Sequence, residues 1–295
     1  MKILITGVGG FIGKELAKVL KNDNNFIIGI TRSNFKNDLN LDKLIIQELT
    51  PYTNFSKYLV EVDIVIHLAG RVHICSKSKS KNMKLFINDN LLVTKNLLEH
   101  SLKCDVKKFL FLSTVGVHGT RSIEPFSEDD YPNPVSPYAK SKLLCENYIR
   151  EFCENTKLEF SIIRSPLVYG KNAPGNLGIL KKFIDYNIPL PILSLNKNKR
   201  SVISINNLIE FIKNCLIKKE AKNQTFLVSD GIDRSTLEII KLFCVLNKCK
   251  IKLFYCPVFL ISIFFIIIRR NDLNDKLIKS FQINNNKSKT IFNAP

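Results

Sequence analysis

The chain has 295 residues, which is enough to bury a substantial core and to form one or two domains. Its formal net charge is +18. The lysines are scattered and no basic block with interleaved aromatic residues occurs, so we expect no nucleic-acid partner; anionic ligands or anionic lipid would still be attracted. The eight cysteines stand singly, without a CxxC pair or a metal-spaced cluster. We therefore expect reduced thiols, a cytoplasmic location and no metal site.

The chain opens with a predicted strand, a glycine turn and a helix. Residues 2–6 form a short, mainly apolar strand, Gly7, Gly10 and Gly13 follow, and residues 11–20 repeat apolar positions at helical spacing. The first glycine allows a tight turn, the second lets backbone approach a pyrophosphate, and the third lets the helix pack closely on the strand. The opening therefore predicts a dinucleotide site, with the helix N-terminus directed at the phosphates. An opening strand also argues against a signal peptide.

The second predicted strand, residues 26–30, ends at Thr31-Arg32-Ser33. An acidic residue here would bind the adenosine ribose of NAD, whereas an arginine suits the 2′-phosphate of NADP. Arg32 therefore favours NADP, with NAD as the alternative cofactor and an ordinary surface arginine as the alternative interpretation.

Strands and helices alternate along the rest of the chain, which indicates an α/β fold. We expect residues 1–170 to form a dinucleotide-binding core and residues 171–295 to form mostly a substrate-binding lobe. Further strands are predicted at 44–48, 62–67, 107–112, 159–164 and 225–229, the last returning to the core, and helices at 83–103, 137–155, 206–219 and 235–247.

One segment is unusually apolar. Residues 253–268 carry no charge and are flanked by Lys252 and Arg269-Arg270. The segment is too short for a comfortable transmembrane helix and contains Pro257. We expect it to be buried in the second lobe, and a peripheral membrane contact is kept as the alternative. The polar residues 284–289 are expected to form a loop.

Tyr138 and Lys142 are four residues apart at the start of a predicted helix, so they share a face. A phenol with a pKa near 10 is a poor acid or base at neutral pH. A neighbouring ammonium would stabilise the phenolate and lower that pKa. Tyr138 could then exchange a hydroxyl proton while a nicotinamide exchanges a hydride at the same carbon.

Six segments follow one another along the chain: TGVGGFIG at 6–13, VDIVIHLAG at 62–70, FLSTVGVHG at 111–119, YAKSK at 138–142, RSPLVYG at 164–170 and KRSVISINNL at 199–208. In this order they resemble the extended short-chain dehydrogenase/reductase family, in its nucleotide-sugar epimerase, dehydratase and reductase group. The resemblance implies a Rossmann-type, doubly wound parallel sheet with a smaller C-terminal substrate-binding lobe.

The resemblance implies roles for individual residues. Thr114 would bind the reacting oxygen, with Ser113 as its rival, beside the catalytic Tyr138 and Lys142. Asn90 matches a helix asparagine near the active site, although Val93 stands where the family usually has glycine. The implied cofactor contacts are Gly7, Gly10, Phe11, Ile12, Gly13, Arg32, Leu68, Ala69, Gly70, Lys142, Pro166 and Val168.

The resemblance also implies a UDP-sugar substrate, with Asn176 near the sugar and diphosphate and Arg200 on the diphosphate. The dehydratase branch needs an Asp-Glu pair directly after the catalytic threonine. Here those positions hold Val115 and Gly116. We therefore expect a UDP-sugar 4-epimerase or 4-ketoreductase of bacterial surface-polysaccharide synthesis, O-antigen and lipopolysaccharide included, and not a 4,6-dehydratase. A homodimer is kept as a hypothesis. A non-catalytic NADP sensor and a membrane-associated sugar-modifying protein are the alternative functions.

Overall fold

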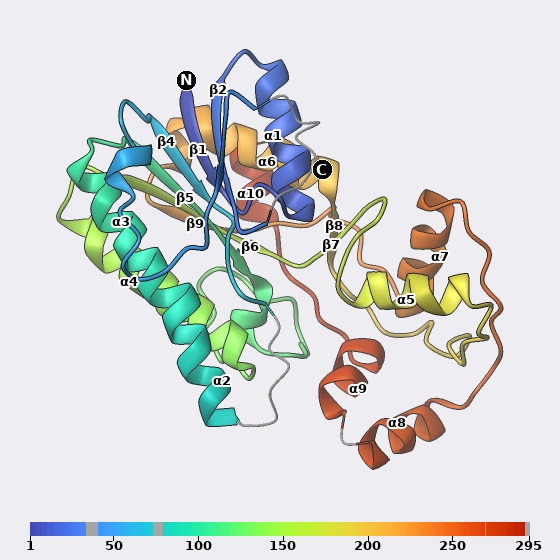
Figure 1. Cartoon of the computed structure of the whole chain (residues 1–295). Helices are drawn as coiled ribbons and strands as arrows, with labels where there is room; N and C mark the ends of the chain where they lie inside the picture. The colour runs from blue at the N-terminus through green and yellow to red at the C-terminus, as the bar shows by residue number, and fades with distance from the viewer. Residues whose placement is uncertain (34–40, 73–78, 269, 293–295) are drawn as a thin grey trace.

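A computed structural model describes residues 1–33, 41–72, 79–268 and 270–292. Its centre is a seven-stranded sheet with the order β3-β2-β1-β4-β5-β6-β9, and all its strands are parallel (Figure 1). This order is that of a Rossmann fold with one added strand. The strands are β1 (Lys2–Thr6), β2 (Phe26–Thr31), β3 (Lys43–Ile46), β4 (Ile64–His67), β5 (Lys108–Thr114), β6 (Glu159–Ser165) and β9 (Gln224–Leu227).

Helices cover both faces of the sheet, and each face has its own apolar core. On one face α1 (Phe11–Asn22) packs with α6 (Ile205–Ile217) over residues of β1 and β4. On the other face lie α3 (Val93–Lys103) and α4 (Pro137–Glu154). Strands buried on both faces are expected to be continuously apolar, as β1 and β4 are.

The helix expected at 83–103 begins earlier and is not regular. It consists of α2 (Lys79–Phe86), a π-helical turn at Ile87–Leu92 and α3, without a break. The turn holds Asn90, which is buried. A π turn inside an α-helix often marks a functional site.

The rest of the chain builds a second lobe beside the sheet (Figure 1). Its apolar core draws residues from three of its helices and from the segment between residues 190 and 202. The domain boundary predicted at residue 170 stays a prediction. Two elements that follow it in the chain, α6 and β9, belong to the sheet side and not to the lobe. The lobe contains the strand pair β7 (Leu167–Tyr169) and β8 (Val202–Ser204), with α5 (Asn176–Asp185), α7 (Thr236–Leu246), α8 (Val258–Ile267) and α9 (Asn271–Ile278).

Two expectations about the C-terminal part are wrong. The loop expected at 284–289 contains the start of α10 (Asn286–Phe292), which packs near β9 because Asn285 donates a hydrogen bond to the Ser229 carbonyl. The apolar segment 253–268 is not buried, since Ile261 alone of its described residues lies in the core. None of the helices in the described ranges is long and apolar enough to span a membrane.

The turn after β1 leaves no room for a side chain at Gly13. A Cβ there would lie 2.4 Å from the Gly7 carbonyl oxygen and 2.8 Å from the Val8 Cα, and both are backbone atoms that cannot move aside. Gly178 occupies the same position in the first turn of α5, but its Cβ would come no closer than 3.5 Å to the Ala173 carbonyl oxygen. The two glycines therefore occupy equivalent helix positions, but only Gly13 has no space for a Cβ atom.

We predict that Gly13→Ala lowers the free energy of unfolding by about 1–3 kcal/mol, because it overpacks the contact between helix and strand. Gly178→Ala should raise it by about 0.4–1 kcal/mol, because alanine restricts the unfolded chain. Urea denaturation of both variants measures the difference. A Gly13→Ala variant as stable as the wild type would contradict the close packing.

Candidate active site

A cavity of about 280 Å³ opens at the carboxyl ends of β1, β2 and β4. Gly7 has a φ of +76°, and a Cβ on it would lie 2.9 Å from the Ala69 nitrogen, so only glycine fits there. Gly10 caps α1 without a side-chain hydrogen bond, which leaves backbone N–H groups free for a phosphate. The cavity is lined by Gly7, Gly9, Gly10, Ile30–Ser33, Gln47–Leu49, Leu68–Arg71, Asp89 and Val93. A dinucleotide fits this cradle.

Only some of the predicted cofactor residues line the cavity, and Gly13 and Lys142 are among those that do not. Gly7, Gly10, Arg32 and Leu68 to Gly70 line the cavity. Phe11 and Ile12 instead direct their side chains into the apolar core, and Phe11 also contacts the core of the second lobe. Pro166 is buried just after β6, and Val168 on β7 packs against the same core.

Two side chains of opposite charge, Arg32 and Glu48, line the cavity. Arg32 is exposed at the end of β2, and Glu48 follows β3 on the same cavity wall. Sequence reasoning missed Glu48 because it looked for a ribose-binding acid only after β2. Gln47, Leu49 and the Arg71–Asp89 ion pair were missed too. Gln47 and Leu49 follow β3, Arg71 follows β4 and Asp89 lies in the π-helical turn, all outside the motifs of the sequence analysis.

Asn90 joins the cavity wall to α4. Its Oδ1 accepts a hydrogen bond of 2.7 Å from the Arg71 backbone N–H, and its Nδ2 donates to the Arg71 carbonyl and the Ser141 hydroxyl. Nearby His67 is bonded to Thr6 and Thr94, and burial lowers its pKa to about 3. His67 is therefore a neutral, buried residue of β4.

Lys142 lies deep beside the cavity on the first turns of α4, a helix whose N-terminus is capped by the Ser136 hydroxyl. Its Nζ donates a hydrogen bond of 2.8 Å to the Leu112 carbonyl and lies 4.2 Å from the centre of the Phe111 ring. A Cβ on Gly70 would lie 3.5 Å from this Nζ. Burial lowers the pKa of Lys142 to about 8.

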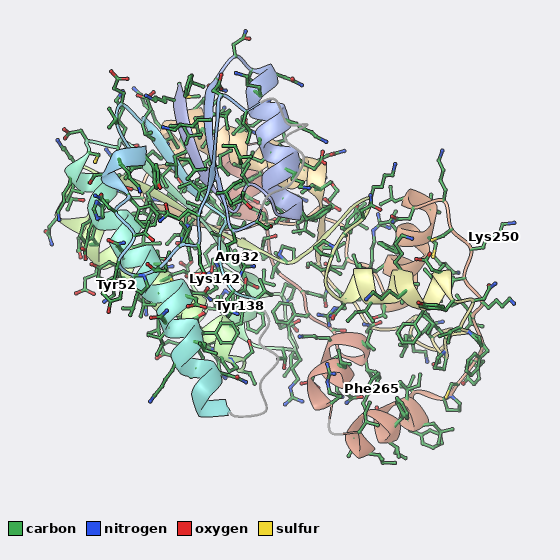
Figure 2. The ribbon with its side chains drawn as sticks, viewed as in Figure 1. Arg32, Tyr52, Tyr138, Lys142, Lys250 and Phe265 are labelled. Carbon is green, nitrogen blue, oxygen red and sulfur yellow. The ribbon has the colours of Figure 1, made fainter. Side chains whose placement is uncertain are left out.

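Tyr138 does not have the lowered pKa that its pairing with Lys142 suggests. Burial raises the pKa of Tyr138 to about 12, and the Lys142 ammonium donates to a backbone carbonyl of β5. The Tyr138 ring packs 6.2 Å from that of Phe86, between ring centres. Figure 2 shows Tyr138, Lys142 and Arg32 together in the middle of the view. The phenol is therefore protonated at neutral pH.

Thr114 ends β5 and begins the 3₁₀ turn η3 (Val115–His118). Its hydroxyl oxygen accepts a hydrogen bond of 3.1 Å from the Gly116 backbone N–H, which leaves its own O–H free to donate. A Cβ on Gly116 would touch both this hydroxyl and Ala139 of α4, so Thr114 lies close to the helix turn that carries Tyr138. The rival Ser113 donates instead to buried Glu146.

Glu146 and Arg164 form a buried ion pair behind these residues. Nε and Nη2 of Arg164 donate to the Glu146 carboxylate, and Nη1 lies 2.9 Å from Nε2 of His118. Burial alone would raise the pKa of Glu146, but the bonds from Arg164 and Ser113 hold it below its usual value. The sequence analysis did not identify this pair. Glu146 could have been found because it stands four residues after Lys142 and so lies on the same inward face of α4.

The two predicted substrate residues lie on the second lobe, outside the cavity. Asn176 is exposed at the first position of α5. Arg200 donates from Nη1 to the Lys279 carbonyl, and burial lowers its pKa to about 10. Its backbone pairs with that of Arg234 through two 2.9 Å hydrogen bonds, an antiparallel arrangement that puts both side chains on one face. The Nε of Arg234 is buried and has no hydrogen-bond partner among the described residues, so Arg234 is a second candidate missed by sequence reasoning.

Comparison with known proteins supports this architecture. The chain is 32% identical to a UDP-glucose 4-epimerase of Vibrio cholerae over 287 residues, which cover 95% of this chain and 86% of the relative. It is 31% identical to a dTDP-D-glucose 4,6-dehydratase of Dictyostelium discoideum over 272 residues, which cover 81% of this chain and 61% of the relative. A crystal structure of UDP-glucuronic acid 4-epimerase from Bacillus cereus with NAD has the same fold, with a TM-score of 0.78, 22% identity and coverage of 100% of this chain and 93% of that one.

The profile of the NAD dependent epimerase/dehydratase family matches residues 3–228. These residues include the glycine cradle, the strands of the sheet and the helix with Tyr138 and Lys142. The chain is a member of the NAD dependent epimerase/dehydratase family.

Proposed function

We propose that this protein is an NAD(P)-dependent enzyme acting at C4 of a UDP-sugar, as a 4-ketoreductase or a 4-epimerase. One observation carries the proposal: Lys142 lies beside Gly70 in the wall of the cavity, one helical turn after Tyr138. A non-catalytic sensor has no need for a phenol and an ammonium at this place. The UDP-sugar is supported by the Vibrio cholerae relative, whose name carries that substrate.

Each residue has a distinct part in the proposed reaction. Gly7 and Gly10 let the backbone hold the pyrophosphate of the dinucleotide, which supplies or accepts the hydride when bound, and Gly13 lets α1 pack closely behind them. Tyr138 gives its phenol proton to the C4 oxygen, or takes it back in the reverse direction. Thr114 donates a hydrogen bond to the same oxygen, and Lys142 supports the developing phenolate and binds the nicotinamide ribose.

Arg32 favours the reductive direction, because NADPH is the usual reductant of an enzyme that exchanges its cofactor in each turnover. Incubation with a panel of UDP-sugars and UDP-4-keto sugars, each with NADH or NADPH, tests the proposal. Stoichiometric oxidation of NADH or NADPH indicates a reductase, and interconversion of two UDP-sugars without net oxidation of the cofactor indicates an epimerase. If the protein converts no sugar of the panel, both functions are contradicted.

We do not propose 4,6-dehydration, although a dehydratase is among the relatives. Val115 is buried and Gly116 has no side chain, so neither can remove a proton from the sugar. A cytoplasmic location is supported by the free thiols of the seven cysteines that the structure describes. The role in surface-polysaccharide synthesis and the homodimer stay predictions.

Tyr138→Phe should lower kcat by about 10²–10⁴-fold, since it removes the general acid and keeps the ring. Cofactor affinity, measured by fluorescence titration, should be unchanged. Tyr148→Phe is the matched control, because it removes a hydroxyl from the same helix, where that hydroxyl donates to Glu99. Activity of Tyr138→Phe above about a tenth of the wild-type rate would contradict the assignment.

Arg32→Asp should shift the cofactor preference from NADP toward NAD. The aspartate would repel the 2′-phosphate and accept a hydrogen bond from a free ribose hydroxyl. Lys43→Asp makes the same change of charge at the opposite end of neighbouring β3 and should leave the preference unchanged. If the ratio of the two dissociation constants stays the same in Arg32→Asp, NADP selection by Arg32 is wrong.

Arg200→Ala should raise the KM for the UDP-sugar about 10- to 100-fold, because each charge-assisted bond to the diphosphate contributes about 1.5–3 kcal/mol. Cofactor affinity should not change. Exposed Lys197 and Lys199 are the matched controls, and their alanine variants should have little effect because solvent screens such charges. Equal losses in all three variants would indicate a diffuse basic surface and remove the role given to Arg200.

A further inference from the structure

The helix α8 (Val258–Ile267) has apolar side chains on all sides except at Ser262, yet only one side faces the protein. Ile261 is 6% exposed and packs into the second-lobe core with partly buried Val258 and Phe265. These contacts fix the orientation of the helix. A helix that is apolar all round is normally buried, in a protein core or in lipid.

The opposite side of α8 is a continuous apolar face. Phe259 is 61% exposed, Phe264 is 58% exposed and Ile267 is 73% exposed. Large exposed side chains continue onto the preceding segment and onto the loop after α5, which pairs with that segment through its backbone. We call this surface the α8 patch; it consists of Leu193, Phe254, Tyr255, Phe259, Leu260, Ile263, Phe264, Ile266, Ile267 and Ile268.

The α8 patch lies at the outer edge of the molecule. In Figure 1 α8 is at the bottom of the second lobe, away from the sheet, with α9 beside it. Within the described chain the patch has no covering element, and a contiguous apolar surface of this kind marks an interaction site. Its ten-residue helix is about 15 Å long. That is half of the roughly 30 Å of a bilayer's hydrocarbon layer, so α8 could lie in a membrane surface but not cross it.

The charge around the α8 patch identifies its partner. Residues 241–279 contain eight lysines and arginines against two aspartates. Lys252, which lies next to the patch in sequence, is exposed, and so are Lys276 and Lys279 on the neighbouring segment, and these three lysines form the basic rim of the patch. Lys250 is also exposed, but Figure 2 shows it well away from Phe265 of α8. A basic rim around an apolar face complements an anionic phospholipid surface. A second copy of this chain is a less suitable partner. In a symmetric dimer the two positive rims would face each other and repel, and the net charge of each chain is +18.

We propose that the α8 patch docks this protein on the surface of an anionic phospholipid membrane. The exposed apolar side chains enter the boundary between headgroups and acyl chains, while the lysines of the rim lie at the level of the lipid phosphates. The proposal is independent of the reaction catalysed, because it involves none of the residues of the glycine cradle or of α4.

Flotation of the full-length protein with vesicles tests the proposal. We expect binding to vesicles of phosphatidylcholine with a quarter phosphatidylglycerol, and at least tenfold weaker binding to phosphatidylcholine alone. The double variant Phe259→Asp with Ile263→Asp should lose at least nine-tenths of the binding at any salt concentration. Lys252→Gln with Lys276→Gln should weaken it several-fold at low salt, with little effect at high salt where charges are screened.

The matched control is Tyr52→Asp with Val60→Asp, which adds the same two charges at exposed apolar side chains on the sheet side of the molecule. Figure 2 shows Tyr52 far from Phe265 of α8. This control should bind vesicles like the wild type, and circular dichroism should show that all variants are folded. Three results would overturn the proposal: no flotation of the wild type with anionic vesicles, equal flotation of the Phe259/Ile263 variant, or light scattering in which that variant turns a wild-type dimer into a monomer.

Discussion

The buried ion pair between Glu146 and Arg164 holds together the elements that carry the candidate catalytic residues. Glu146 comes from α4, Arg164 from β6, and their network reaches Ser113 on β5 and His118 on η3. Thr114 adjoins Ser113, and Lys142 is one helical turn before Glu146. A buried charge is stable only while its partner is present, and loss of one partner costs about 3–5 kcal/mol. The pair therefore fixes one arrangement of sheet, helix and turn, on which the geometry of Thr114, Tyr138 and Lys142 depends.

Local pattern was enough to predict most of the sheet side. The short apolar runs of β1 and β4 predict buried strands. The spacing of the glycines after β1 predicts the tight turn between β1 and α1. The helix that carries Tyr138 was predicted within a residue of its ends, because Ser136 and Pro137 are typical of a helix start. The candidate site residues there followed from the same pattern, while their roles rest on the family resemblance.

The parts that sequence could not give depend on contacts between distant segments. Arg200 meets Arg234 and Phe281 through backbone pairing, and no local periodicity encodes that register. The helix α10 forms in a polar stretch because Asn285 and its neighbours bind the end of β9. The pKa of Tyr138 depends on burial as well as on the distance to Lys142, so a motif that places the two on one face predicts their proximity but not their ionisation.

The π turn at Ile87–Leu92 has a consequence for how the helix around it can evolve. Such a turn is equivalent to one extra residue inserted into an α-helix, and each residue of an α-helix advances its direction by about 100°. Because the turn absorbs that extra residue, its loss would leave a regular α-helix with α2 and α3 in their present directions, so Phe86 would still face Tyr138 and Leu97 would stay in the core. A deletion within α2 or α3 would instead rotate the two helices relative to each other by about 100°. A single-residue deletion should therefore be tolerated better between residues 87 and 92 than in the helices on either side, except at Asn90, whose amide binds Arg71 and Ser141.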